Sequence, residues 1–437
     1  MVPPSLPNLK ISQDNRYLLT EDGRPFFWLG DTAWELFHRL DKAEALRYLQ
    51  DRANKGFNVV QAVILAELEG LTDPNALGDL PLLDLDPLKP NEAYFNYVDF
   101  LLQEAAKRGI YMGLLPTWGD KYNKAWGVGP EIFTPENAFE YGKYLGARYS
   151  DFSNIIWIMG GDRLPANTED YQIVCQMSLG IRSGGAKQLM TMHPKGGNIA
   201  SGIYGKESWL EVDMFQSHHM KGCKEYNFTK RALSAVPKRP VIDGEPGYEN
   251  IPNFLNKVHA NRLDAYDVRR AAYWSMLSGA AGHTYGCNEI WQMFRPGKTP
   301  LHGAEMPWHQ AMDLPGSQQM GYMKAFFERL PWQRLRLEPE FLSGFNWKTG
   351  SYVVAMVDSE RKFALAYSPA GRRIRANLDL LESEKLQAFW YEPATNMLAT
   401  INDKIERRLT VFQPDNLTTK SPDRLLMVID KESWDTL

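Results

Sequence analysis

Eight short apolar runs, rich in β-branched and aromatic residues, alternate with longer amphipathic stretches over roughly the first 300 residues of the chain. This alternation predicts parallel strands that are separated by helices. The predicted strands are residues 26–30, 58–64, 110–115, 155–159, 188–192, 214–217, 240–243 and 282–285. Eight such units match an α/β fold of the (β/α)8 TIM-barrel type better than an open sheet.

Start and stop signals support the helical part of this pattern. The predicted helices are residues 41–55, 94–108, 135–149 and 264–277, and a hairpin-like segment, 9–26, precedes the first strand. Asp41 is a suitable N-cap, and Thr134 is followed by Pro135 at the first helical position. No G-x-G-x-x-G motif follows the first predicted strand, which argues against a dinucleotide-binding fold.

The pattern changes near Pro331, after which short alternating strands are joined by polar turns. The predicted strands of this part are residues 351–358, 362–368, 373–378, 386–391, 408–412 and 425–429. An antiparallel β-sandwich of about 100 residues accounts for such a segment. We therefore predict two domains, a barrel over residues 1–335 and a small β-sandwich over residues 336–437.

Composition narrows the class of protein further. The formal net charge of −4 at pH 7 does not indicate binding to nucleic acid or to an anionic membrane, since such binding needs an excess of positive charge. No apolar run reaches the length of a membrane span, and the three cysteines show no metal-binding spacing. The first residues lack the regions of a signal peptide, so we expect a cytoplasmic protein, or a periplasmic or secreted one if a signal peptide has been removed.

Functional side chains of such barrels lie at the carboxyl ends of the strands. Carboxylate, amide, imidazole and aromatic side chains gather at these positions, as in a carbohydrate-binding cleft. The residues that we expect to bind substrate are Asp31, Trp34, Gln61, Trp118, His193, Gln216, His218, Tyr285 and Trp291. For Asp31 a capping or supporting role is the alternative, and for each Trp it is a place in the core.

Asp162 and Glu245 end the fourth and seventh predicted strands, on opposite parts of one barrel mouth. Glycosidic cleavage needs two carboxyl groups, one to protonate the leaving oxygen and one to attack the anomeric carbon or activate water. We predict that these two residues are the catalytic pair. The alternatives are a helix cap or an ion pair with Arg163 for Asp162, and a salt-bridged rim residue for Glu245. Asp243 and Glu249 compete with Glu245, and strand alternation predicts that Asp243 points to the same side, but deeper.

Three stretches, residues 27–34, 156–162 and 243–249, resemble the apiosidase-like glycoside hydrolases, which are family 140 and carry a barrel called domain of unknown function 4038. The resemblance implies that Asp162 is the acid/base and Glu245 the nucleophile. The wider clan has Asn-Glu where this chain has Gly161-Asp162, whereas the apiosidase-like family shares the Asp. Residues 389–395 and 412–414 resemble the collagen-binding-type β-sandwich attached to many such barrels, a name from which we infer no collagen binding.

The function expected from these observations is polysaccharide degradation by an exo-acting, retaining glycoside hydrolase with no cofactor and no metal. Its partner would be an oligosaccharide or polysaccharide of plant or microbial origin, with apioside-type linkages as the reference substrate. Retention would require carboxyl groups ~5–5.5 Å apart, and inversion ~6.5–9.5 Å. Two alternatives stay open: a non-catalytic glycan-binding protein, and a metal-dependent hydrolase that uses His193, His218 and His219. Oligomeric state cannot be read from the sequence.

Overall fold

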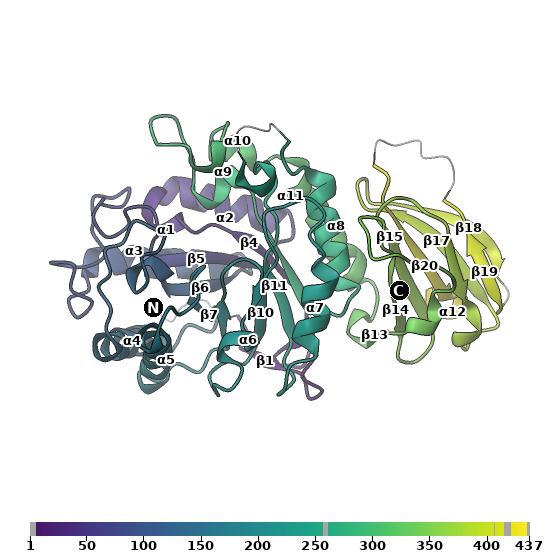
Figure 1. Cartoon of the computed structure of the whole chain (residues 1–437), viewed down its shortest axis with the longest axis horizontal. Helices are drawn as coiled ribbons and strands as arrows, with labels where there is room; N and C mark the ends of the chain where they lie inside the picture. Colours follow the sequence, from purple (N-terminus) through teal and green to yellow (C-terminus); the bar gives the residue numbers. More distant parts are fainter. Residues whose placement is uncertain (1–5, 257–260, 406, 415–420, 435–437) are drawn as a thin grey trace.

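A computed structural model describes residues 6–256, 261–405, 407–414 and 421–434 of the chain. Eight parallel strands form a curled sheet in the N-terminal part (Figure 1). They are β4 (Trp28–Thr32), β5 (Val59–Leu65), β6 (Tyr111–Thr117), β7 (Ile155–Gly160), β8 (Met190–His193), β10 (Asp213–Gln216), β11 (Val241–Glu245) and β12 (Gly282–Tyr285). The short strand β9 (Asn198–Ile199) adds an antiparallel partner to β10. Each parallel strand overlaps a predicted one.

The sheet closes on itself between β8 and β10. The backbone N–H groups of Glu211 and Val212 donate to the Met190 carbonyl at 3.0 and 3.3 Å, and the Thr191 hydroxyl donates to the Val212 carbonyl at 2.7 Å. These bonds satisfy backbone groups that an open edge would leave unpaired. The order β8-β7-β6-β5-β4-β12-β11-β10 then runs around a barrel, which confirms the predicted fold class.

Helices cover the outside of this sheet. The longer ones are α2 (Lys42–Asn54), α3 (Glu92–Lys107), α4 (Pro135–Tyr149), α5 (Thr168–Ser183), α7 (Glu225–Leu233), α8 (Ala265–Met276) and α11 (Pro315–Glu328). The short helices are α1 (Leu36–Arg39), α6 (Ser201–Tyr204), α9 (Asn288–Trp291) and α10 (Trp308–Ala311), whereas α12 (Lys431–Trp434) belongs to the C-terminal part. Asp41, Thr134 and Asp264 form capping boxes, each with the third residue of its helix, which explains why α2, α4 and α8 begin where they do.

Antiparallel strands make up the C-terminal part. A six-stranded sheet has the order β13 (Leu335–Leu337), β14 (Val354–Asp358), β15 (Phe363–Ser368), β20 (Arg424–Asp430), β17 (Leu386–Glu392) and β18 (Met397–Ile405). A two-stranded sheet pairs β16 (Ile374–Asn377) with β19 (Leu409–Phe412). Buried apolar side chains from both sheets, such as Ile374, Ala388 and Phe412, form one cluster. At the other end of the chain, β1 (Leu9–Ile11), β2 (Leu18–Thr20) and β3 (Pro25–Phe26) form a small antiparallel sheet.

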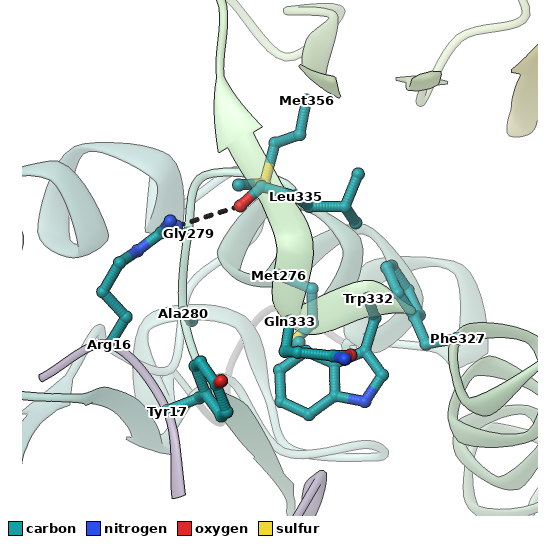
Figure 2. A pocket seen from close by; sticks show the side chains of 10 residues that line it. All are labelled: Arg16, Tyr17, Met276, Gly279, Ala280, Phe327, Trp332, Gln333, Leu335 and Met356. Atoms are coloured by element: carbon teal, nitrogen blue, oxygen red, sulfur yellow. Dashed lines mark hydrogen bonds between the residues drawn. The ribbon is translucent and has the colours of Figure 1, made fainter. Parts of the chain in front are cut away.

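The C-terminal strands pack directly against the barrel helices. Arg269 of α8 is paired with Asp423 at 2.9 Å, and both side chains are almost fully buried. Near β13, the Arg16 guanidinium donates to the Leu335 carbonyl at 3.0 Å beside a cavity of about 20 Å³ (Figure 2). Such a cavity is only large enough for about one water molecule. The two parts therefore share a packed junction, and the predicted boundary at residue 335 stays a prediction.

Two further features concern the whole chain. Within the described ranges, no helix combines the length and the apolar character that a membrane crossing needs. Cys175, Cys223 and Cys287 are buried free thiols.

Candidate active site

Asp162 lies just beyond β7 in a turn of unusual backbone conformation. Gly160, Gly161 and Asp162 have φ angles of 87°, 118° and 53°, so three successive residues are in the left-handed half of φ/ψ space. A Cβ atom on Gly161 would lie 2.8 Å from the Gly119 backbone nitrogen, so only glycine fits there. The turn presents the Asp162 carboxyl, whose side chain is 21 % exposed, at the barrel mouth.

Glu245 reaches the same mouth because of an irregularity in β11. Phe215 of β10 pairs with Asp243, but the next residue, Gln216, pairs with Glu245, so Gly244 is an extra residue in the ladder. Such a bulge reverses the side on which the following side chain points. The prediction that Asp243 shares the side of Glu245 is therefore wrong. The Asp243 carboxylate accepts a hydrogen bond from Ser275 of α8 at 2.7 Å, in the layer between barrel and helices.

His193 links the two predicted catalytic residues. Its Nδ1 accepts a hydrogen bond from the backbone N–H of Asp162 at 3.2 Å, so the ring proton is on Nε2. This Nε2 lies 2.7 Å from Oε2 of Glu245, and Nε2 of His219 lies 3.0 Å from Oε1. Both ring nitrogens are close enough to the carboxylate to stabilise its negative charge. Two imidazoles thus hold the Glu245 carboxylate, and Asp162 is anchored to one of them.

The two carboxyl groups have opposite pKa shifts. Burial and the negative charge of Glu245 raise the pKa of Asp162 to about 6, although His193 and Arg163 act against this rise. Burial would also raise the pKa of Glu245, but His193 and His219 more than offset it and lower the value to about 2. Between these values Asp162 holds a proton while Glu245 is ionised, which is the division of roles expected of a general acid and a nucleophile.

The alternative interpretation of Asp162 as an ion-pair residue finds only weak support. Arg163 Nη1 lies 3.6 Å from the Asp162 carboxylate but donates at 2.9 Å to the Asp162 backbone carbonyl. The guanidinium also donates to the carbonyls of Asn123 and Lys124. Arg163 therefore holds the turn together, and the Asp162 carboxyl remains available at the mouth.

Several residues predicted to bind substrate are buried around this pair. Trp34 and Trp118 are 2 % and 3 % exposed, and their rings pack against His193 with centroids 5.3 and 5.8 Å away. The Gln61 amide donates to the Gly244 carbonyl at 2.9 Å, next to Glu245. Gln216 is the strand neighbour of Glu245. These residues line the site, and their contacts with sugar stay predictions.

The other predicted residues lie further from the carboxyl pair. Tyr285 donates to Glu249 at 2.6 Å, and Trp291 donates to Asn288 at 3.3 Å. His218 is exposed, while its neighbour His219 contacts Glu245. Asp31 is fully buried and supports the barrel.

Asp31 accepts a hydrogen bond from the Tyr48 hydroxyl at 2.6 Å and pairs with Arg52 at 3.3 Å. Both side chains of this ion pair have no exposed surface. This arrangement matches the supporting role that was the alternative for Asp31.

Trp126 is a candidate binding residue that was not predicted from the sequence. Its ring is 55 % exposed and lies under the Arg163 guanidinium, 4.1 Å from the ring centroid, with the Lys195 ammonium 4.7 Å away. An exposed indole held next to Asp162, a predicted catalytic residue, can stack on a sugar face. Only its place in the long segment after the third strand could have suggested it.

Several buried polar atoms near Glu245 have no hydrogen-bond partner among the described residues. They include Gln61 Oε1, Gln216 Oε1, Trp118 Nε1 and His219 Nδ1. Buried polar groups in proteins are rarely left without a hydrogen bond, and the hydroxyl groups of a bound sugar can supply the missing partners. Over the described ranges, no three or more His, Cys, Asp or Glu side chains are grouped as a metal ion would require.

Comparison with known proteins gives consistent results. Residues 12–334 match the model of the family described as "Apiosidase-like, catalytic domain", and residues 340–429 match "Putative collagen-binding domain of a collagenase". No curated protein matches the sequence significantly.

Among solved structures, one described as a glycoside hydrolase has a TM-score of 0.90 and 30 % identity, with 99 % of each chain covered. A glycoside hydrolase family 5 structure from Bacteroides vulgatus ATCC 8482 has a TM-score of 0.90 and 31 % identity, with 97 % of this chain and 93 % of that chain covered. An exo-beta-1,4-mannosidase from Opitutaceae bacterium strain TAV5 shares 13 % identity at a TM-score of 0.51 over 73 % of this chain and 63 % of that one, a likeness of fold alone.

Proposed function

The chain belongs to the family of apiosidase-like catalytic domains and is a glycoside hydrolase, and from this premise we propose that it is exo-acting and retaining, with Asp162 as acid/base and Glu245 as nucleophile. The observation that carries the proposal is the opposite protonation of two carboxyl groups joined through His193. Apioside-type linkages are the substrate class that the family description suggests.

The proposed reaction has two steps. Asp162 gives its proton to the leaving glycosidic oxygen while a Glu245 oxygen attacks the anomeric carbon, which forms a glycosyl ester and breaks the glycosidic bond. Asp162, now ionised, then takes a proton from water, and this water attacks the same carbon and releases Glu245. The second step returns the proton to Asp162, so atoms and charges balance over the cycle.

The low pKa of Glu245 favours a nucleophile over a general base. A carboxylate whose pKa is about 2 has little tendency to take a proton from water. The same low basicity makes it a good leaving group from the glycosyl ester. This reasoning supports retention, because an inverting enzyme would need Glu245 to act as the base.

The depth of the site supports exo action. The Glu245 side chain is only 6 % exposed, and buried aromatic rings surround its partner His193. The end of a sugar chain can enter so enclosed a site, whereas the middle of a chain needs a cleft open on both sides. The sugar unit recognised would be the terminal one.

The pH dependence of the reaction tests the role of Asp162. Because catalysis needs its proton, we expect kcat on an aryl glycoside to be high below pH 6 and to fall as pH rises through the Asp162 pKa of about 6. Asp162→Asn should lose this basic limb and lower kcat by about 10²- to 10⁴-fold.

Asp213 provides a matched control for this experiment. Burial raises the pKa of this carboxyl to about 6 as well, but its side chain accepts from the Ser201 backbone, away from Glu245. The Asp213→Asn variant should keep the fall in kcat at high pH. If this fall survives in Asp162→Asn and disappears in Asp213→Asn, Asp162 is not the general acid.

A further inference from the structure

A hollow of about 710 Å³ begins at the rim that carries the catalytic pair. One end is lined by Ser217 and His218, which directly follow β10. The hollow then follows α7 past Lys224, Lys230 and Arg231 and reaches Lys348 of the C-terminal part. In Figure 1, α7 lies on the side of the barrel that faces the C-terminal strands. The hollow therefore joins the barrel mouth to the second part of the chain.

The charged side chains that line this hollow are all basic. Lys224, Lys230, Arg231 and Lys348 line it, and none of its lining residues is acidic. Lys224, Arg231 and Lys348 are exposed, and within the described ranges none of these three forms an ion pair with a carboxylate. Lys230 donates to the hydroxyl group of Tyr352 at 3.4 Å and lies over the ring of the same residue. This concentration of cations contrasts with the net charge of −4 of the whole chain and predicts an anionic ligand.

An exposed pair of aromatic residues, Phe345 and Trp347, directly precedes Lys348 in the sequence. Phe345 and Trp347 are 88 % and 64 % exposed, and their ring planes are within 10° of parallel, with centroids 6.1 Å apart. The segment between them is anchored, because the Asn346 amide exchanges two hydrogen bonds with the Val353 backbone at 2.8 and 3.0 Å. Neighbouring large aromatic rings in solvent are unusual unless they contact a partner, and parallel rings suit the apolar faces of successive sugars.

We propose that this hollow and the Phe345–Trp347 pair form a second glycan-binding site, which holds a carboxylate-bearing oligosaccharide chain outside the catalytic pocket. Continuity with the barrel mouth favours a glycan over other polyanions, because His218 borders the hollow and the adjacent His219 contacts Glu245. The cations would bind uronate carboxylates, and the rings would stack on sugar faces. The proposal rests on the glycoside hydrolase class of the chain and not on the roles of Asp162 and Glu245.

The test measures binding by isothermal titration calorimetry, in the full chain carrying Glu245→Gln so that no turnover occurs. The probes are hexagalacturonate, its fully methyl-esterified form, which keeps the rings but lacks the charges, and single-stranded oligothymidylate as another polyanion. One variant combines Lys224→Gln, Arg231→Gln and Lys348→Gln, and a second combines Phe345→Ala and Trp347→Ala. Arg47→Gln with Lys143→Gln and Lys187→Gln is the control triple, because these side chains are exposed and none of them lines the hollow.

We expect hexagalacturonate to bind at least tenfold more tightly than its ester or oligothymidylate. The basic triple and the aromatic double should each weaken hexagalacturonate binding by about tenfold, and the control triple by less than about twofold. Equal affinity for the ester, equal affinity for oligothymidylate, or equal losses in the basic and control triples would overturn the proposal. Circular dichroism and thermal unfolding of each variant confirm that a loss of binding is not a loss of fold. Because every arm carries the same Glu245→Gln substitution, the differences in affinity between the arms do not depend on the catalytic role of Glu245.

Discussion

Glu245→Gln is expected to lower kcat/KM on an aryl glycoside by on the order of 10⁴-fold or more, the scale seen when a covalent nucleophile is removed. The amide cannot carry the negative charge that attacks the anomeric carbon. It also loses the attraction of the carboxylate for the His193 and His219 nitrogens, 2.7 and 3.0 Å away. Glutamine keeps the size of the side chain, so the fold should survive, and steady-state kinetics measure the loss.

Glu249 provides the matched control for this variant. It is a buried glutamate four residues further along, and it accepts hydrogen bonds from Tyr285 and from the Gly316 backbone at 2.6 and 3.1 Å. Glu249→Gln should weaken these contacts, lower stability modestly and leave kcat within about tenfold of the wild type. Activity that is kept in Glu245→Gln but lost in Glu249→Gln would transfer the role to Glu249, which competed with Glu245 in the sequence.

The second large effect concerns stability. Asp31→Asn should lower the free energy of unfolding by about 3 kcal/mol, because it removes the charge opposite the fully buried Arg52 guanidinium. Arg52 keeps a second contact, with Asp51 at 2.8 Å, which limits the loss. Urea unfolding followed by tryptophan fluorescence measures the change. We expect the KM of the folded variant to stay within about twofold of the wild type, since Asp31 is not exposed to the mouth.

Asp313→Asn is the surface counterpart of this change. Its carboxylate pairs with Lys55 at 3.4 Å, but the side chain is 79 % exposed, so the free energy of unfolding should move by no more than about 0.5 kcal/mol. An Asp31 variant with unchanged stability and a raised KM would contradict the supporting role and would favour direct sugar contact.

The barrel was predictable because its signals are local and repeated. All eight parallel strands overlap predicted strands, because a strand that is buried on both faces is a continuous apolar segment in the sequence. The four predicted helices begin within about two residues of their observed starts, where side chains such as Asp41 and Thr134 cap them. The strand β18, Met397–Ile405, was not predicted, because polar residues interrupt its apolar pattern.

The details of the site depended on features that periodicity does not encode. Because Gly244 is an extra residue in β11, the side chains of Asp243 and Glu245 point to opposite sides of the sheet. A prediction from strand alternation assumes that no such bulge exists. Two adjacent histidines follow β10, and periodicity does not indicate that His219, which comes after a φ of 148° at His218, is the one that contacts Glu245. Trp126 lies in a long loop, whose conformation depends on contacts with Arg163 that are distant in sequence.

The pairing of Asp162 and Glu245 is tested most directly by azide rescue of their glycine and alanine variants, with the anomeric form of the product read by proton NMR. The account predicts that azide restores Glu245→Gly and forms a glycosyl azide of inverted configuration, because azide replaces the nucleophile. Azide should also restore Asp162→Ala, but with retained configuration, because there it opens the glycosyl ester held by Glu245. Retained configuration with Glu245→Gly, or no rescue of either variant on a substrate that the wild type cleaves, would contradict the assigned roles.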